Sequence, residues 1–470
     1  MAGSLGGRIF ELAGYAFIAA FLLIPLASII TRAAAFPVPF NLLSRNILQA
    51  SLSALFSIIL AFPLSYALTK KTAFSRILSA LSMIPLVLPQ PAMILSMVVL
   101  FGANGLFKLP FSLYGIEGII LAHSLYNFPL AARIIASRWN SADSYGDAAR
   151  SLGAGKFKSF LHVGLPSLLP AVYSAFMVVF AFSFTSFAIP IVFGGIANST
   201  LEVEIYRTFF REFNFQKGAF LAVLQLLIFI PFAFAWKSVP WSLGTSERRG
   251  GGLSKYLSVI YLAAILLIFG SPYLRATMGA VSTGPVVNSF ALGLASALLA
   301  VALWLLFGRL IGKWAFFLLA ISPVVLAVAF QQYPYSPFLL LIGHALLSFG
   351  LVCALLLPQS GMLQRFESAA SSLGAGPFRR FTDVILPLSL KPLLLAFLVS
   401  FSFSLGETAF LLSYSQGFST LSTVILQAFA SYRFSEGYFY ALLLIGISFI
   451  VALLAEGLHV LGSGFPQKVR

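Results

Sequence analysis

The sequence predicts an all-α polytopic membrane protein, with about 12 transmembrane helices in two parallel six-span halves. Of its 470 residues, 60% are hydrophobic and only 9% are charged, whereas soluble domains carry about 25% charged residues. Apolar runs long enough to cross a bilayer, which takes about 20 residues, recur along the chain. No hydrophilic stretch is long enough to fold into a soluble catalytic or nucleotide-binding domain.

The predicted spans follow these apolar runs, and each half of the chain contributes the same number. By residue number they are 13–31, 47–69, 77–101, 118–137, 168–189 and 220–236, followed by 256–273, 290–307, 315–330, 338–357, 390–411 and 438–461. An even number of spans per half gives both halves the same orientation in the membrane.

The placement of lysine and arginine predicts that both termini face the cytoplasm, because short cytoplasmic loops are enriched in these residues. With this orientation only a minority of the 29 basic residues fall outside, namely Arg32, Arg45, Lys108, Arg207, Arg211, Lys217, Arg275 and Arg433. We therefore expect a multi-pass protein of the cell membrane (plasma or inner membrane), with anionic lipid against its basic loops.

The formal net charge of +16 does not indicate nucleic-acid binding. The excess lies in loops that flank the predicted spans, where anionic lipid favours it. The single cysteine, Cys353, falls within a predicted span, so we expect neither a disulfide framework nor a cysteine-type metal site. We expect no metal ligands and no catalytic residues in this chain.

Two polar segments are near copies of each other: 147–155 reads DAARSLGAG and 368–376 reads SAASSLGAG. The likeness keeps a constant offset of 221 residues from the pair His123 and His344 onward. Both copies are predicted to face the cytoplasm. For the two histidines we expect a repeated packing or hydrogen-bonding role.

The repeat predicts two fused half-domains. The first covers 1–241 with its loop at about 141–166, a polar linker covers 242–254, and the second covers 255–470 with its loop at about 362–387.

Each loop has the features of a short helix that binds a partner. In the first copy Ser144 and Asp147 have the spacing of a capping box, and Gly153 predicts the end of the helix. A helix of about two turns is unstable alone, so contacts on both sides must hold it. Small residues allow close approach and a leucine offers an apolar contact: Ala148, Ala149 and Leu152, then Ala369, Ala370 and Leu373. The alternative is an amphipathic connector on the membrane surface, which two matching copies disfavour.

The loops resemble the signature loop of permease subunits of binding-protein-dependent ATP-binding-cassette importers of type I. That motif has an acidic residue, two alanines, three residues, a glycine and a later leucine-proline pair. The matching residues are Asp147, Ala148, Ala149, Gly153 and Pro166, then Ser368, Ala369, Ala370, Gly374 and Pro387. Two departures occur: Asp147 replaces the usual glutamate, and Ser368 takes the acidic position, with Glu367 one residue earlier.

The resemblance implies that the two loops form coupling helices, which dock on two ATPase subunits at the cytoplasmic side. It also implies an extracellular or periplasmic solute-binding protein. ATP and Mg would bind the partner ATPase subunits, and this chain would bind no cofactor and would not be an enzyme. Among fused two-half permeases the chain is similar to those for thiamine and ferric iron. The supporting segments are 182–188, 194–195, 201–206 and 404–407.

Glu407 is the strongest candidate for a translocation path. It lies in the predicted span 390–411 at the position equivalent to Ser186, and an intramembrane carboxylate costs roughly 2.5–3.5 kcal/mol unless it faces protein or water. We expect Glu407, with Thr185, Ser186 and Tyr414, to line the path and attract a cationic solute. The alternative is a carboxylate that is hydrogen-bonded to a neighbouring helix.

A charged outer segment either docks the binding protein or is merely solvated. Its residues are Glu202, Glu204, Arg207, Arg211 and Glu212.

Two other classes remain as alternatives. An ion-coupled secondary transporter of the major facilitator type also has twelve spans in two parallel halves. Its acidic-basic loop signature is missing from 70–76, which reads KKTAFSR. A membrane-embedded transferase would need paired acidic or histidine clusters near one membrane face, and the sequence shows none.

Overall fold

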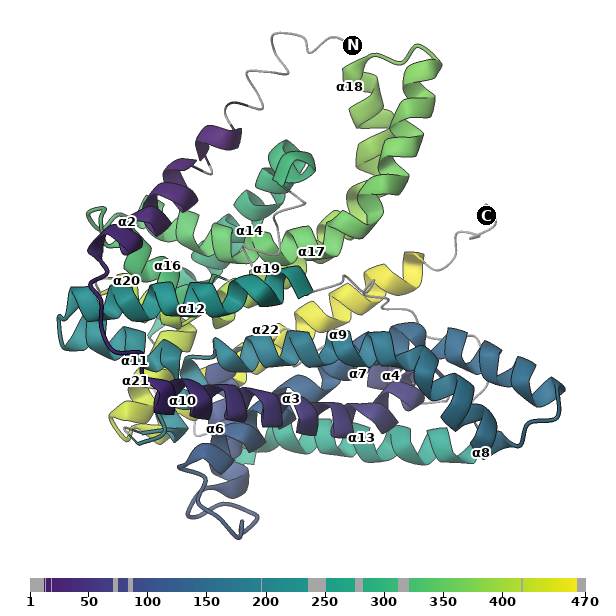
Figure 1. Ribbon diagram of the computed structural model, residues 1–470, viewed down its shortest axis with the longest axis horizontal. Coiled ribbons are helices and arrows are strands. Elements are labelled where there is room, and N and C mark those ends of the chain that lie inside the picture. Colours follow the sequence, from purple (N-terminus) through teal and green to yellow (C-terminus); the bar gives the residue numbers. More distant parts are fainter. Residues whose placement is uncertain are drawn as a thin grey trace. The chain divides into compact units, whose positions relative to one another are not determined.

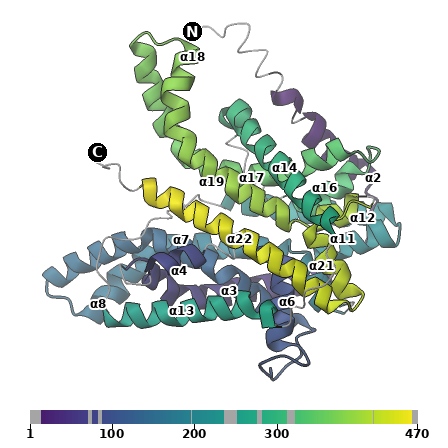
Figure 2. The same cartoon turned by 180° about the vertical axis from the view of Figure 1, so that it is seen from behind.

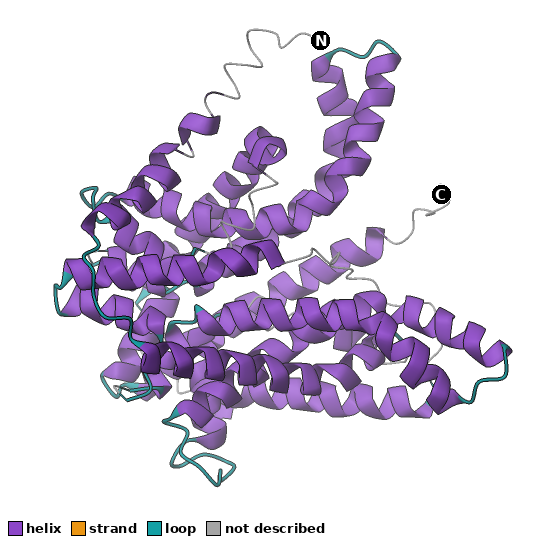
Figure 3. Cartoon of the chain, in the orientation of Figure 1, coloured by secondary structure: helices purple, strands orange, loops and turns teal. Residues whose placement is uncertain are grey.

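The computed structural model describes residues 12, 14–17, 19–70, 75–82, 88–195, 197–235, 251–274, 282–311, 321–415 and 417–462. Within these ranges every regular element is a helix (Figure 3). The predicted fold class, an all-α polytopic membrane protein, is confirmed.

The helices carry the labels of Figure 1. In the first half they are α2 (Ile24–Arg32), α3 (Phe40–Leu68), α4 (Ser75–Leu81), α6 (Gln90–Phe101), α7 (Ile116–Ser151), α8 (Lys156–Ser159), α9 (Leu165–Phe184), α10 (Ala188–Phe193), α11 (Leu201–Tyr206) and α12 (Phe215–Ala235). In the second they are α13 (Gly252–Gly270), α14 (Thr283–Ile311), α16 (Pro323–Phe330), α17 (Pro337–Ser372), α18 (Pro377–Arg379), α19 (Leu386–Gly406), α20 (Ala409–Tyr414), α21 (Leu421–Ala430) and α22 (Phe434–Gly462). Wider π-helical turns adjoin several of these helices: η1 (Ala19–Leu23), η2 (Phe160–Gly164), η3 (Arg207–Arg211) and η6 (Arg380–Ile385). A short 3-10 turn, η4 (Ser271–Leu274), follows α13.

Nine helical segments in the described part of the chain are long and apolar enough to cross a membrane. They are Gly14–Arg32, Phe40–Leu68, Ile116–Ser151, Lys156–Phe184, Gly252–Gly270, Thr283–Gly308, Pro337–Leu357, Pro377–Gly406 and Phe434–Ala455. Three shorter apolar helices accompany them: Gln90–Phe101, Phe215–Phe229 and Leu421–Ala430. The count of 12 spans therefore stays a prediction.

Four predicted spans differ from the helices found. The spans 168–189 and 390–411 each contain a helix end, at Phe184 and at Gly406. The span 77–101 is not one helix, because α4 ends at Leu81 and α6 begins at Gln90 after Pro89. Proline suits a helix start, where the N–H that it lacks would have no partner. Of the predicted span 315–330, the described residues contain the short helix α16, and 312–320 lie outside them.

The chain forms two compact units, and each takes helices from both sequence halves. One unit comprises Met1–Pro37, Glu204–Ala233 and Ser282–Thr420, and the other comprises Val38–Val203, Phe234–Val281 and Leu421–Arg470. In the first of these α2 packs against α16, and in the second α13 packs against α3, α4 and α6. The leading helix of each half thus packs with the core of the other half. The repeat boundaries 1–241 and 255–470 stay a prediction, and most of the linker lies outside the described residues.

Each unit contains an equivalent core of three long helices. In one unit α3, α7 and α9 pack against one another, and in the other α14, α17 and α19 do. Along α3 a row of small residues is fully buried at helical spacing: Ala50, Ala54, Ser57 and Ala61. Small side chains let helix backbones approach closely, which is how helices associate in lipid, where the hydrophobic effect between them is absent.

This packing gives a first testable prediction. Ala54→Leu adds bulk to a fully buried site on α3, so we expect the free energy of unfolding to fall by about 1–3 kcal/mol. The matched control is Leu55→Ala, because the next side chain is 48% exposed. Unfolding titrated with dodecyl sulfate in detergent micelles measures both variants. A larger loss for the Leu55 variant would contradict the assigned helix faces.

Candidate functional site

The two polar repeats form the tips of two long helical hairpins. In one hairpin α7 packs against α9 and turns through α8, and in the other α17 packs against α19 and turns through α18 (Figures 1 and 2). Both α7 and α17 have 36 residues, so each is about 54 Å long. Each tip is therefore joined to its core by a continuous helix.

The first tip ends α7 with a Schellman motif. Gly153 has a φ of +92°, in the left-handed region that favours glycine. Its N–H donates to the carbonyl of Arg150 at 2.9 Å, and the N–H of Ala154 donates to that of Ala149 at 3.1 Å. These bonds satisfy carbonyl groups that the helix end would leave free.

The second tip repeats this motif. Gly374 has a φ of +81°, its N–H donates to Ser371 at 3.0 Å, and that of Ala375 donates to Ala370 at 3.0 Å. The expected end of the helix at the glycine is confirmed. The expected separate two-turn helix beginning at Ser144 is wrong, because α7 continues without a break from Ile116. The polar segment contains no proline that would interrupt it.

Both tips expose large apolar side chains. Leu152 is 90% exposed and Leu373 is 88% exposed. Their role as apolar contacts to a partner stays a prediction. Phe157 and Phe378, at 76% and 78% exposed, complete each tip. These phenylalanines are not among the site residues predicted from the sequence. Their signal was recurrence at the same place in both copies, four residues after the glycine.

The remaining motif residues lie at or near the tips. Ala148 and Ala369 are exposed, and Ala149 and Ala370 are half-buried on the last turns of α7 and α17. Pro166 and Pro387 occupy the first turns of α9 and α19.

The acidic residues differ between the two copies. The carboxylate of Asp147 pairs with Arg150 one turn along α7, whereas Glu367 faces Arg380 on the returning arm. Ser368, next to Glu367, is exposed.

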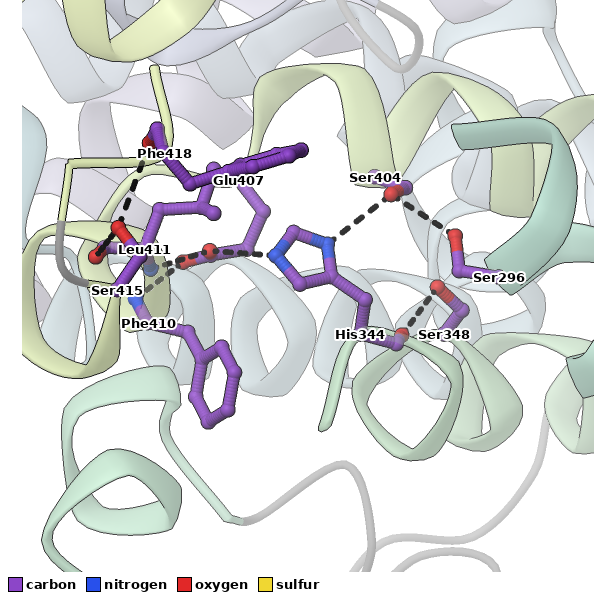
Figure 4. Close-up of polar contacts among 9 residues, drawn as sticks. All are labelled: Ser296, His344, Ser348, Ser404, Glu407, Phe410, Leu411, Ser415 and Phe418. Atoms are coloured by element: carbon purple, nitrogen blue, oxygen red, sulfur yellow. Dashed lines mark hydrogen bonds and ion pairs between the residues drawn. The ribbon is translucent and has the colours of Figure 1, made fainter. Parts of the chain in front are cut away.

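The second kind of candidate site is a break between two helices, and it contains Glu407 (Figure 4). α19 ends at Gly406 and α20 begins at Ala409. The carboxylate accepts hydrogen bonds from the N–H groups of Phe410 at 2.8 Å and Leu411 at 3.3 Å. Glu407 is only 6% exposed, so it stabilises the start of α20, where the helix dipole favours negative charge.

A buried polar chain continues from this carboxylate. Nε2 of His344 on α17 lies 3.6 Å from Oε2 of Glu407. Nδ1 of His344 lies 3.0 Å from the hydroxyl of Ser404 on α19, which accepts a hydrogen bond from Ser296 on α14 at 2.9 Å. The three core helices are thus tied together beside the helix break.

The first half has an equivalent break with different chemistry. α9 ends at Phe184 and α10 begins at Ala188. Ser186, equivalent to Glu407, donates a hydrogen bond to Gln90 at 3.2 Å. His123 lies 3.3 Å from the side-chain oxygen of Gln49, so both buried histidines have hydrogen-bonding roles, as expected.

The four predicted path residues lie at or just after these breaks, two in each unit. Thr185 donates to the carbonyl of Ala181 within its own helix at 2.9 Å. Tyr414, at the end of α20, is buried and donates to the carbonyl of Pro334 at 3.3 Å.

The predicted outer docking residues are largely paired with one another. Arg207 lies 2.9 Å from Glu204 and 3.1 Å from Glu212. Arg211 packs over the ring of Tyr206. Glu202 is fully buried and is therefore not part of an exposed docking surface. Among the described residues no group of three His, Cys, Asp or Glu side chains is placed to hold a metal ion.

Comparison with known proteins defines the class. Residues 53–237 match the family described as "Binding-protein-dependent transport system inner membrane component". Together with the many apolar helices and the relatives named below, this match supports a membrane permease subunit of an ATP-binding-cassette importer. It also favours this class over a secondary transporter.

Individual relatives carry more specific names. The chain is 25% identical over 426 residues to the thiamine transport system permease protein ThiP of Brucella suis, covering 79% of this chain and 78% of that protein. It is 27% identical to ThiP of Haemophilus influenzae, with 77% and 78% covered. A shorter match, 28% identical over 169 residues, is to the ferric transport system permease protein FbpB of Actinobacillus pleuropneumoniae, with 31% and 23% covered.

The Glu407 cap gives a second prediction. Glu407→Ala removes the acceptor for two buried N–H groups of α20, so we expect the free energy of unfolding to fall by about 1–3 kcal/mol. Glu407→Gln keeps one carbonyl oxygen and should lose less. Glu436→Ala is the control, because it removes a partly exposed ion pair with Arg433 in the first turn of α22, where such pairs contribute about 0–1 kcal/mol. Unchanged stability in both Glu407 variants would show that the cap is not needed.

Proposed function

We propose that this permease couples ATP hydrolysis by two partner ATPase subunits to the import of a thiamine-like solute. An extracellular or periplasmic binding protein delivers the solute. The observation that carries the proposal is the pair of equivalent hairpins, each with an exposed leucine and an exposed phenylalanine at its tip.

The exposed tips are well suited to docking. Burying a leucine or phenylalanine side chain contributes about 1.5–3 kcal/mol, so two such residues on each tip supply a substantial part of a binding energy. The space beside the glycine turn is open to a partner surface, because a β-carbon added at Gly153 or Gly374 would meet no atom of this chain within 4 Å.

The charge near the tips supports a cytoplasmic location. Basic residues accompany both tips: Arg150, Lys156, Lys158, Arg365, Arg379 and Arg380. Such residues are enriched in cytoplasmic loops, where the ATPase subunits would bind ATP and Mg. In the same orientation both termini are cytoplasmic.

Transport then follows from rigid-body movement of the hairpins. When the ATPase subunits close on ATP, each tip moves with its partner, and the continuous helices α7 and α17 carry this motion into their three-helix cores. Rocking of packed helical bodies is an established way to open one side of a transporter and close the other.

Two observations support a thiamine-like solute. The relatives named as thiamine permeases match over most of this chain, whereas the ferric relative matches over less than a third. A thiamine-like solute is an organic cation, which an acidic group on the path would attract. Much of the selection would belong to the binding protein.

For the path we propose Thr185, Ser186, Glu407 and Tyr414. Three of them lie within the breaks between α9 and α10 and between α19 and α20, and Tyr414 ends the short helix that follows the second break. Discontinuous helices commonly form solute sites in transporters, since their ends offer free backbone groups.

The docking proposal predicts the effect of the double variant Leu152→Ser/Leu373→Ser. We expect recovery of the ATPase subunits on the purified permease to fall at least tenfold and uptake to be lost, because four apolar contacts are reduced to two. Tyr145→Ser, an exposed aromatic on α7 before the tip, is the control and should bind normally. Full recovery and full uptake in the double variant would contradict the coupling role.

The energy source distinguishes the class from its alternative. Uptake should stop when ATP is depleted and persist when the proton gradient is collapsed. The opposite pattern would indicate an ion-coupled transporter.

The path proposal predicts that Glu407→Gln lowers uptake of a cationic solute several-fold at unchanged ATPase binding. The carboxamide keeps the size of the side chain while the charge is lost. Rates should be normalised to folded protein, because Glu407 also caps α20. A normal rate for the Gln variant would remove Glu407 from the path.

A further inference from the structure

Both hairpins are bridged between their arms at the same pair of positions. In the first hairpin the pair is Gly146 on α7 and Ser159 on α8. In the second it is Glu367 on α17 and Arg380 at the start of η6. The two pairs are related by the same 221-residue offset as the rest of the repeat, although the side chains at equivalent positions differ in chemical type.

The first bridge is a short neutral hydrogen bond. The hydroxyl of Ser159 donates to the carbonyl of Gly146 at 2.7 Å, and Ser159 is only 3% exposed. A β-carbon added to Gly146 would lie 3.3 Å from this hydroxyl. The two arms are therefore close together at this point, and the absence of a side chain at Gly146 leaves room for the hydrogen bond.

The second bridge is an ion pair of long side chains. Nη1 of Arg380 lies 4.0 Å from Oε1 of Glu367, and the two side chains are 24% and 21% exposed. The glutamate and arginine thus connect the same backbone positions by side chains where the first hairpin uses a carbonyl and a hydroxyl.

We propose that these two pairs are positioning residues, which fix the angle between the arms of each coupling hairpin so that a moving tip carries both arms with it. Beyond the bridge, Leu152 and Phe157 are too exposed to hold the arms together, and so are Leu373 and Phe378. The bridge is therefore a contact between the arms close to each tip. This inference rests on the proposed coupling function and goes beyond it, because it concerns contacts within the chain.

The proposal also explains the unusual acidic position of the second loop. Glu367 is equivalent to Gly146, not to Asp147, and it faces the residue equivalent to Ser159. The glutamate and the arginine act as one replacement for the glycine and the serine. Ser368 then occupies the motif position with no acidic function of its own.

Exchanging the bridges tests the proposal. The single variants Glu367→Gly and Arg380→Ala each break the second bridge, and the double variant Glu367→Gly/Arg380→Ser installs the first hairpin's pair, a hydroxyl facing a backbone carbonyl. We expect solute imported per ATP hydrolysed to fall roughly two- to fivefold in each single variant, as for loss of one modest polar contact. The double variant should regain the normal ratio. Arg365→Ser, which removes an exposed charge two residues before Glu367, is the matched control and should keep the normal ratio.

A distance measurement separates the bridge from the ATPase. Spin labels at Met362→Cys and Leu388→Cys report on the two arms, since both sites are exposed and the native Cys353 is buried. In the purified chain the distance distribution should broaden in each single variant and narrow again in the double variant.

Unchanged distances in the single variants, or a double variant that does not recover, would overturn the proposal. Broadened distances with a normal transport ratio would overturn it as well. If the wild-type chain binds no ATPase, the coupling function fails, and the distances still decide whether the bridges set the arm angle.

Discussion

Every helix end leaves backbone N–H or C=O groups without partners in the helix, and within lipid no water is present to satisfy them. Much of this chain's architecture follows from how the backbone groups at its helix ends find hydrogen-bond partners. At the hairpin tips, glycine in the left-handed conformation lets the last carbonyls of α7 and α17 bond within the turn. At the break between α19 and α20, the carboxylate of Glu407 takes the free N–H groups. The places where helices stop are the places that can serve coupling and transport.

The hairpins connect these two kinds of helix end. α17 carries a tip at one end and His344 near the other, and His344 contacts both Ser404 and Glu407. In the proposed mechanism, a movement of the tip would reach the break through one continuous helix and a buried polar contact. In the first half α7 connects its tip to His123, which contacts Gln49 of α3. The two halves share the same arrangement of a long helix with a buried histidine, although the polar residues that contact the histidine differ.

The sequence was sufficient for the class and for the location of the tips, because hydropathy and internal repetition are strong signals. It could not give the extent of α7, since the apolar run marks where lipid ends, whereas the helix continues until Gly153. α2 packs with helices of the second half and α13 with helices of the first half. No local sequence pattern predicts this packing, because each of the two helices is simply apolar. Glu407 was recognised as an unusual carboxylate, but its capping role required the break after Gly406 to be known. Glu367 was read as a displaced motif residue because its partner across the hairpin, Arg380, is distant in sequence.

The central claim, that the two tips dock on ATPase subunits, is tested most directly by site-specific cross-linking in membrane vesicles. Cysteine would be placed at Leu152 or Leu373, with the exposed Tyr432 as the comparison site on the opposite predicted side. The native Cys353 is buried and gives little background. The account predicts that both tip cysteines cross-link to the ATPase subunit, with a yield that changes on adding ATP, and that the cysteine at 432 does not. Cross-linking from 432, or none from either tip, would contradict it.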